Sequence, residues 1–248
     1  MIYERKKQIT YNDIDANGDI SLTAVLKYMT EANWENAEEI NIGISQIPKT
    51  NLAFVTQRIA LKIHQLPGLG DPFILRTWPA EEKRLTFVRK GEFLDSSGNK
   101  LIQWESLWVL ININKRKIKR PSALNIDVPL YGDLDVSITT EKIKLPDEQK
   151  IKHSLSYTHT VDFSDLDFYR HMSNTIYGNL LSNAYRRSGY CSPLMKAGAE
   201  IHFNYLNEGQ LDDKISVSLQ ELENQIFLIG TTDVHTVFTA NIKYEEQV

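Results

Sequence analysis

Two segments of the chain carry hydrophobic residues at helical spacing. In the first segment they are Leu22, Val25, Leu26, Met29, Ala32 and Ala37, and in the second they are Ile176, Leu180, Leu181 and Ala184. Residues at these intervals share one face of an α-helix. We therefore predict one long amphipathic helix in each half, the second with Ser173 or Asn174 as its N-cap and Gly189 as its stop signal.

Runs of alternating or β-branched residues follow each predicted helix. In the first half they read FVTQRIALKIHQL, FILRTW, RLTFVRKGEFL and KLIQWESLWVLINI, and in the second half AEIHFNYLN, KISVSLQEL, QIFLIGTT and HTVFTANIKY. Such runs are typical of strands with one buried face. The pattern predicts an α+β protein made of two units, each a long helix wrapped by a curved antiparallel sheet.

An internal repeat supports this division. YNDIDANGDI near the N-terminus matches FSDLDFYRHM further on, and Asp13 and Asp165 stand 152 positions apart. At the same offset Asp15 matches Asp167, while Asp19 occupies the place of His171. Self-similarity of this kind indicates that each half is one copy of the same structural unit.

The segment between the two copies has no sustained hydrophobic period and contains several Pro and Gly residues. We predict an N-terminal domain over residues 1–125, a linker over 126–149 and a C-terminal domain over 150–248. Each sheet would leave an edge unpaired, and pairing of those edges would join the units side by side as a covalent pseudo-dimer.

Charge and composition restrict the classes of function. The formal net charge is −4, which argues against a protein that coats nucleic acid, because such binding needs many clustered cations. The strongest basic cluster is KRKIKR, Lys115 to Arg120, which is either a docking site for an acidic partner or a solvated turn.

The single cysteine, Cys191, excludes an internal disulfide framework and fits a reducing compartment. MIYERKKQIT lacks the apolar stretch of a signal peptide, and no apolar run approaches the roughly 18 residues that a membrane span requires. A cytoplasmic protein without a membrane span is the expectation.

Three blocks of sequence resemble a known family. They are QRIALKIHQLPGLGDPFILRTW with the later ESLWVLININKRKIKRPSAL, then SDLDFYRHMSNTIYGN, and finally FNYLNEG. The order of Arg58, Pro67, Gly70, Asp71, Thr77, Trp78 and Trp108 belongs to this likeness. In these blocks the chain resembles the plant and bacterial acyl-[acyl carrier protein] thioesterases, which are built from two hotdog domains in one polypeptide.

The resemblance implies positions for the catalytic residues. The family's aspartate, histidine and glutamate fall on Asp167, His171 and Glu208. Tyr169 stands where plant members usually have an asparagine, and Gly209 where they have a cysteine. A cysteine nucleophile on that strand is therefore excluded.

The implied function is hydrolysis of a fatty acyl-[acyl carrier protein] thioester to the free fatty acid and the carrier protein. The first domain would hold the acyl chain and the second would carry the chemistry, without cofactor or metal. An acyl-coenzyme A thioesterase and a non-catalytic acyl-binding or sensing hotdog protein remain as alternatives. Whether the protein forms a homodimer is left open.

Thioester hydrolysis needs an activated water and donors for the oxygen that becomes negative. His171 can take the proton of water if a carboxylate, Asp167 or Glu208, holds its other nitrogen. Backbone amides near Ser173 and Asn174 are the expected oxyanion donors, because a helix N-terminus presents unpaired N–H groups. Tyr169 is either a phenol donor to the thioester or water, or an aromatic cap over the site.

Overall fold

The structure, a computed structural model, describes all residues except 1, 148–150, 152–153 and 246–248. The first half begins with a short strand, a helical turn and a long helix: β1 (Tyr3–Gln8), η1 (Tyr11–Asp13) and α1 (Leu22–Glu39). It continues with η2 (Ile44–Gln46), α2 (Ile47–Thr50), β2 (Leu52–Ile63), β3 (Pro72–Glu82), β4 (Thr86–Leu94), β5 (Lys100–Asn112), β6 (Lys117–Lys119) and η3 (Pro121–Leu124).

The second half repeats this order with fewer elements. It comprises β7 (Leu155–Thr160), η4 (Phe163–Asp165), α4 (Ile176–Arg187), β8 (Ala199–Tyr205), β9 (Lys214–Leu222), β10 (Gln225–Thr231) and β11 (Thr236–Tyr244). Both predicted helices and the strands that follow them are present. The internal repeat seen in the sequence is therefore a repeat of structure.

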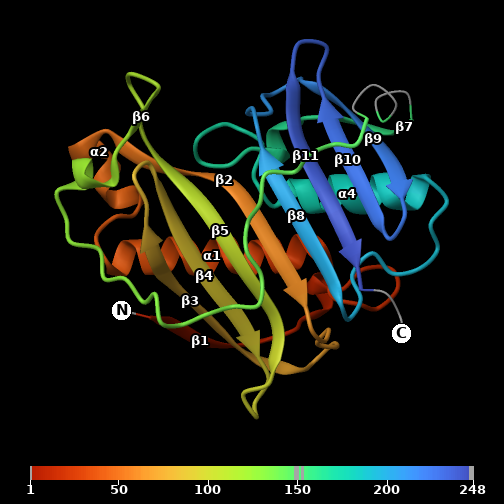
Figure 1. Ribbon diagram of the computed structural model, residues 1–248, viewed down its shortest axis with the longest axis horizontal. Coiled ribbons are helices and arrows are strands. Elements are labelled where there is room, and N and C mark those ends of the chain that lie inside the picture. Colours follow the sequence, from red (N-terminus) through yellow and green to blue (C-terminus); the bar gives the residue numbers. More distant parts are fainter. Residues whose placement is uncertain (1, 148–150, 152–153, 246–248) are drawn as a thin grey trace.

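All described strands join in one sheet, in the order β1-β3-β4-β5-β2-β8-β11-β10-β9-β7, with β6 paired to β5. The two halves meet where β2 and β8 run antiparallel, with Ile59 opposite Phe203. Both long helices lie behind the sheet in Figure 1. The predicted α+β architecture, in which the sheet edges of two units pair, is confirmed.

The principal core lies between the sheet and the two helices and continues across both halves. It includes Leu26 of α1, Leu181 of α4 and Phe203 of β8, all almost fully buried. At the helix crossing a Cβ on Gly178 would lie 2.7 Å from Thr23 Oγ1, and Thr23 Oγ1 donates to Asn179 Oδ1 at 2.6 Å. The crossing therefore needs a residue without a side chain.

Helix α4 ends as predicted but begins later than predicted. Gly189, with φ of +91°, follows Arg187 and Ser188 and stops the helix. Its N-cap is Thr175, not Ser173 or Asn174. The physical reason is that the Ser173 amide donates to Asp165 O at 2.8 Å, which holds this residue in the preceding turn.

Residues 125–147, which follow η3, form a strap across the outer face of the sheet, in front of it in Figure 1. Val136 and Ile138 pack on an outer cluster of the first half, and Ile143 and Leu145 on one of the second half. Glu105 of β5 accepts hydrogen bonds from the Thr140 amide and hydroxyl at 2.8 and 2.9 Å. Over residues 125–147 the strap has neither helix nor strand, and it covers apolar surface on both halves.

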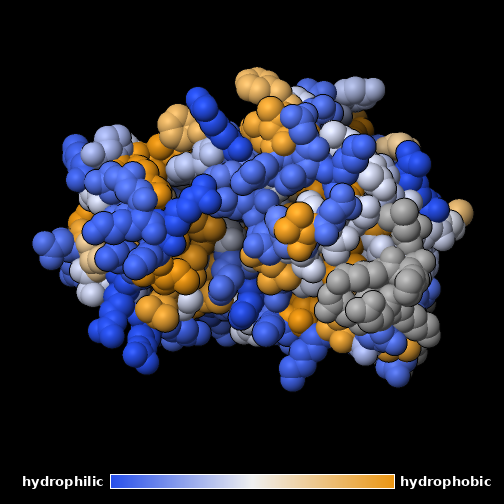
Figure 2. All heavy atoms as spheres, turned by 90° about the horizontal axis from the view of Figure 1, so that it is seen from above, coloured by the Kyte–Doolittle hydropathy of each residue, from blue (hydrophilic) through white to orange (hydrophobic). Residues whose placement is uncertain are grey.

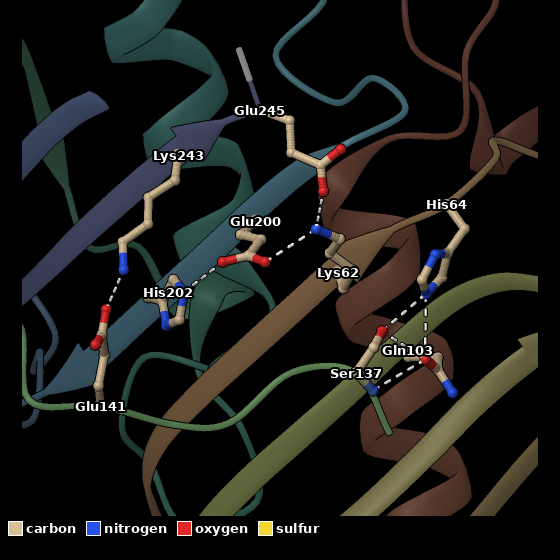
Figure 3. Close-up of polar contacts among 9 residues, drawn as sticks. All are labelled: Lys62, His64, Gln103, Ser137, Glu141, Glu200, His202, Lys243 and Glu245. Carbon is tan, nitrogen blue, oxygen red and sulfur yellow. Dashed lines mark hydrogen bonds and ion pairs between the residues drawn. The ribbon is translucent and has the colours of Figure 1, made fainter. Parts of the chain in front are cut away.

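Polar side chains cross the joint of the halves beneath the strap (Figure 3). Lys62 of β2 donates to Glu200 of β8 at 3.0 Å and also contacts Glu245. His202 of β8 is only 3 % exposed, and Glu141 of the strap pairs with Lys243 of β11. These contacts fasten the strap and the joint together.

Candidate active site

The turn that leads into α4 is held by the carboxylate of Asp167, the residue at which the turn begins. Asp167 Oδ1 accepts a hydrogen bond from the Tyr169 amide at 2.8 Å, and the Asp167 amide donates to His171 O at 2.9 Å. Arg170 completes the turn with a left-handed backbone, φ +63°. The carboxylate of Asp167 therefore fixes the backbone from which His171 projects.

The equivalent turn of the first half has the same hydrogen bonds. Asp15 Oδ1 accepts from the Asn17 amide at 2.8 Å, and the Asp15 amide donates to Asp19 O at 2.8 Å. Gly18, with φ +87°, occupies the place of Arg170. The aspartate explains the turn in both halves, and the imidazole is the group that the second half adds.

His171 lies against Glu208. Its Nε2 is 3.1 Å from Glu208 Oε2, with 28 % and 44 % of the two side chains exposed. The Met172 amide donates to Gly209 O at 2.8 Å, which fastens the segment after β8 beside the turn. The structure therefore brings the His171 and Glu208 side chains into direct contact, whereas the hydrogen bond between Asp167 and His171 goes to the His171 backbone amide, at 3.4 Å.

Tyr169 lies in the same turn, two residues before His171. Burial raises the pKa of its phenol, and the negative charges of Asp167 and of Glu38 on α1 raise it further. The phenol is therefore protonated at neutral pH and able to donate. Its ring contacts Phe168 edge to face, with the centroids 5.6 Å apart.

Large hydrophobic side chains are exposed at this turn. Figure 2 shows the molecule from above, where hydrophobic residues lie among a majority of hydrophilic ones. Phe163 and Phe168, at the turn itself, are among the exposed large hydrophobic residues. Scattered exposure of this kind is ordinary for a protein surface.

The amides at the start of α4 are not equally available. The Ser173 amide already donates to Asp165 O, so a carbonyl oxygen would have to share it. The Ser173 hydroxyl lies 3.0 Å from Thr175 Oγ1. Of the two amides expected from the sequence, that of Asn174 is the one that does not donate to Asp165 O.

Two tyrosines that the sequence analysis did not single out lie beneath the site. The Tyr177 ring of α4 meets the Tyr205 ring of β8 edge to face at 4.9 Å. Burial, then the charges of Glu208 and Asp167, raise the pKa of Tyr177. The Tyr205 hydroxyl is buried and has no hydrogen-bond partner among the described residues. Strand alternation, which places Tyr205 on the same face as Ile201 and Phe203, was the available signal.

The other described histidines of the second half lie apart from His171. His159 Nε2 is 2.7 Å from Asp165 Oδ2, His202 is on the opposite face of the sheet, and His235 follows β10. His153 falls outside the described residues. Over the described part of the chain, no group of three His, Cys, Asp or Glu side chains is placed to hold an ion. Within the same residues no helix has the length and apolar character to cross a membrane.

Comparison with known proteins gives consistent sequence matches. Residues 1–122 match the family model described as the acyl-ACP thioesterase N-terminal domain. An acyl-[acyl-carrier-protein] hydrolase of Cuphea viscosissima is 24 % identical over 71 % of this chain and 45 % of its own length. A palmitoyl-acyl carrier protein thioesterase of Arabidopsis thaliana is 23 % identical over 74 % of this chain and 47 % of its own. The chain thus spans about half the length of the curated relatives it matches.

Solved structures match along the whole chain. An acyl-ACP thioesterase from Bacteroides thetaiotaomicron has a TM-score of 0.78 at 19 % identity and covers 98 % of both chains. A 12:0-ACP thioesterase from Umbellularia californica has a TM-score of 0.78 at 17 % identity, covering 99 % of this chain and 98 % of its own. The fold is that of a double hotdog protein. With the family model and the curated relatives, this chain belongs to the acyl-[acyl carrier protein] thioesterase family.

Proposed function

We propose that this protein hydrolyses fatty acyl-[acyl carrier protein] thioesters to the free fatty acid and the carrier protein. The observation that carries the proposal is the 3.1 Å contact between His171 Nε2 and Glu208 Oε2, on a turn whose copy in the first half has no histidine. Membership of the thioesterase family supports it.

Glu208 accepts a hydrogen bond from His171 Nε2–H and so favours the tautomer in which Nδ1 carries the lone pair and acts as the base. Nδ1 takes a proton from water while the water oxygen attacks the thioester carbonyl carbon. The carbon–sulfur bond then breaks, and the thiolate receives the proton from the imidazolium. General base catalysis of this kind contributes about 10² to 10⁴-fold. Asp167 contributes by fixing the turn.

The developing oxyanion needs donors near the start of α4. The Asn174 amide and the protonated phenol of Tyr169 are the groups that we assign to this role. Each such donor is worth about 3 to 4 kcal/mol of transition-state stabilisation in enzymes where one was removed. In this proposal the phenol replaces the asparagine that plant members of the family usually have.

The acyl chain, in this proposal, lies in the N-terminal unit, residues 1–125, and the chemistry belongs to the unit of residues 150–248. The presence of Asp19 where the second turn has His171 supports this division. The first turn keeps the hydrogen bonds of the second but has no base.

Site variants provide the direct experiment. We expect His171→Ala to lower kcat for thiol release from an acyl carrier substrate by about 10²-fold or more, because the general base is removed. Glu208→Gln should have a smaller effect in the same direction. Asp19→Ala, at the matching place of the first turn, is the control and should leave the rate within about twofold. A His171→Ala enzyme with the wild-type rate would rule out this site.

The carrier protein is acidic in this family, so the docking surface should be basic. Arg186 already donates to Asn17 Oδ1 at 2.6 Å and to the carbonyls of Tyr190 and Cys191. The exposed hairpin Lys115 to Arg120 is therefore the favoured docking site for the carrier protein.

Turnover of the carrier substrate should fall as ionic strength rises, since exposed charges are screened. Rates on acyl-coenzyme A, measured in parallel, show whether coenzyme A thioesters are substrates instead. Equal salt dependence for both thioesters would contradict docking at the hairpin.

A cytoplasmic location completes the proposal, and the assembly is left open between monomer and homodimer. The exposed free thiol of Cys191 is compatible with a reducing compartment. The molar mass from light scattering decides between monomer and dimer.

A further inference from the structure

A cation is buried in the first half of the molecule. Arg89 lies on the inner face of β4, between the sheet and α1, and is only 8 % exposed. Its Nη1 donates to Asn36 Oδ1 of α1 at 2.7 Å. In the sheet it stands between Pro79 of β3 and Ser106 of β5. The guanidinium therefore lies in the interior of the unit to which the proposed function assigns the acyl chain.

The polar groups around Arg89 are neutral. Thr77 Oγ1 donates to Asn33 Oδ1 at 3.0 Å, and Ser106 Oγ donates to the Arg89 carbonyl at 3.3 Å. Within the described residues, no hydrogen bond or ion pair joins the Arg89 guanidinium to a carboxylate.

The carboxylates of α1 face elsewhere. Glu31 and Glu39 pair with Lys7 and Arg5 of β1, and Tyr3 of β1 donates to Glu35. These three acids lie on the side of the helix that meets the edge of the sheet. The fourth, Glu38, accepts hydrogen bonds from the Ser45 amide and hydroxyl. None of them is placed to neutralise the buried guanidinium.

A buried charge without a counter-ion is unfavourable. Burial lowers the pKa of Arg89 to about 10, which leaves the group protonated at neutral pH. Charges in protein interiors are normally paired, because loss of hydration must be offset. A planar guanidinium presents its donors as a fork that matches the two oxygens of a carboxylate.

Apolar side chains surround this polar group on both sides along the strands. Phe54, Phe87 and Leu110 form a cluster towards one end, and Phe93 and Trp104 pack edge to face at 5.7 Å towards the other. A ligand that reaches Arg89 through such surroundings needs a hydrocarbon part as well as an anionic group.

We propose that Arg89, with Asn36, binds a carboxylate carried at the far end of an acyl chain, so that the site accepts ω-carboxyacyl thioesters. This inference rests on the proposed function only in placing the acyl chain in the first unit. The competing explanation is structural: Asn36 is in the last turn of α1, whose terminal carbonyls carry partial negative charge that favours a cation.

Binding to the full-length protein distinguishes these explanations without any turnover. The probes are α,ω-diacids and the monocarboxylic acids of the same chain length, measured by isothermal titration calorimetry over a series of lengths. We expect at least one diacid to bind about tenfold or more tightly than its matched monoacid, because a second charge-assisted contact forms. Arg89→Met should abolish or reverse that preference, and Arg89→Lys should retain part of it.

Lys90→Met is the matched control. Lys90 is the next residue of β4, but it points to the outer face and pairs with Asp135 at 2.7 Å. This variant should keep the diacid preference of the wild type. If Arg89→Met does not fold, the wild-type ratio and the lysine variant still decide the question.

Three results would overturn the proposal. The first is equal affinity of the wild type for diacid and monoacid at every length, and the second is an unchanged preference in Arg89→Met. The third is binding of inorganic phosphate that depends on Arg89 with no diacid preference, which would leave an anion site unconnected with acyl chains. Absence of thiol release by the wild type would refute the proposed hydrolysis but not a measured diacid preference.

Discussion

Arg170 and Gly18 occupy the same place in the two turns, and both have a left-handed backbone, with φ of +63° and +87°. A glycine adopts this conformation without the steric cost of a Cβ. A side chain there costs about 1 kcal/mol or more. The turn of the candidate site is therefore the more strained of the two.

We expect Arg170→Gly to stabilise the protein by about 0.5 to 1 kcal/mol, because relief of strain exceeds the added entropy of the unfolded chain. Urea unfolding of variant and wild type measures the difference. Arg84→Gly is the control, since Arg84 has no left-handed backbone, and it should destabilise. A less stable Arg170→Gly would show that the arginine side chain has contacts that outweigh the strain.

His202 makes stability depend on pH. Burial lowers the pKa of its imidazole from the ordinary 6.5, with help from Lys243 and against the opposing charges of Glu141 and Glu200. The unfolded chain therefore binds a proton more readily than the folded chain. This contribution to stability is present above about pH 6.5 and is lost as the pH falls below it.

His202→Leu should accordingly flatten the decline in unfolding free energy between about pH 7 and pH 5. Chemical unfolding at a series of pH values provides the measurement. Parallel curves for variant and wild type would mean that other groups cause the decline.

At this scale the sequence predicted some contacts and not others. The sequence named Asp167 as one of two carboxylates that could hold the His171 imidazole, whereas the hydrogen bonds of its carboxylate go to backbone amides of its own turn, as for Asp15. The contact of His171 with Glu208 depends on a segment that follows a different strand, so only family resemblance indicated it. Arg89 was not predicted as a buried residue, because an arginine on a strand is usually on the solvent side. Its hydrogen bond to Asn36 of α1 shows that it faces inward.

Among the elements, α1 and α4 pack closely where they cross. A Cβ on Gly178 would also lie 2.8 Å from the Thr23 backbone nitrogen, and backbone cannot move aside as a side-chain tip can. Gly178→Ala should therefore destabilise by about 1 to 3 kcal/mol through overpacking.

Thermal unfolding of Gly178→Ala beside Gly68→Ala checks this expectation. At Gly68 an added Cβ would meet only Asp71 Oδ2, at 3.4 Å, so that variant should change stability little. Equal melting temperatures for the two variants would show that the helices can move apart at no cost.

Strands and helices were predictable because their hydrophobic period is local. The strap was predicted as a linker, since Val136, Ile138, Ile143 and Leu145 follow neither helical nor strand spacing over a sufficient length. What places them is the outer face of the sheet, which has apolar clusters around Trp78 and Phe227. Packing against a distant surface leaves no periodic signal in the segment itself.

For the whole molecule, the joint of β2 with β8 determines how the halves unfold. The main core continues across the joint, and the strap packs on both sides of it. We expect one cooperative transition, with equal calorimetric and van't Hoff enthalpies, because neither half retains a closed core alone. Two resolved transitions in a calorimetric scan would show that each half folds independently.

The paired turns have a consequence for how such a molecule can change. In an assembly of two identical chains, a substitution in one turn appears in the other as well. Here both turns are in one chain, so Asp19 and His171 can differ while the hydrogen bonds around Asp15 and Asp167 stay the same. One gene can therefore specialise each copy separately. Asp19→His would test whether the first turn, once it has an imidazole, supports a second reaction centre.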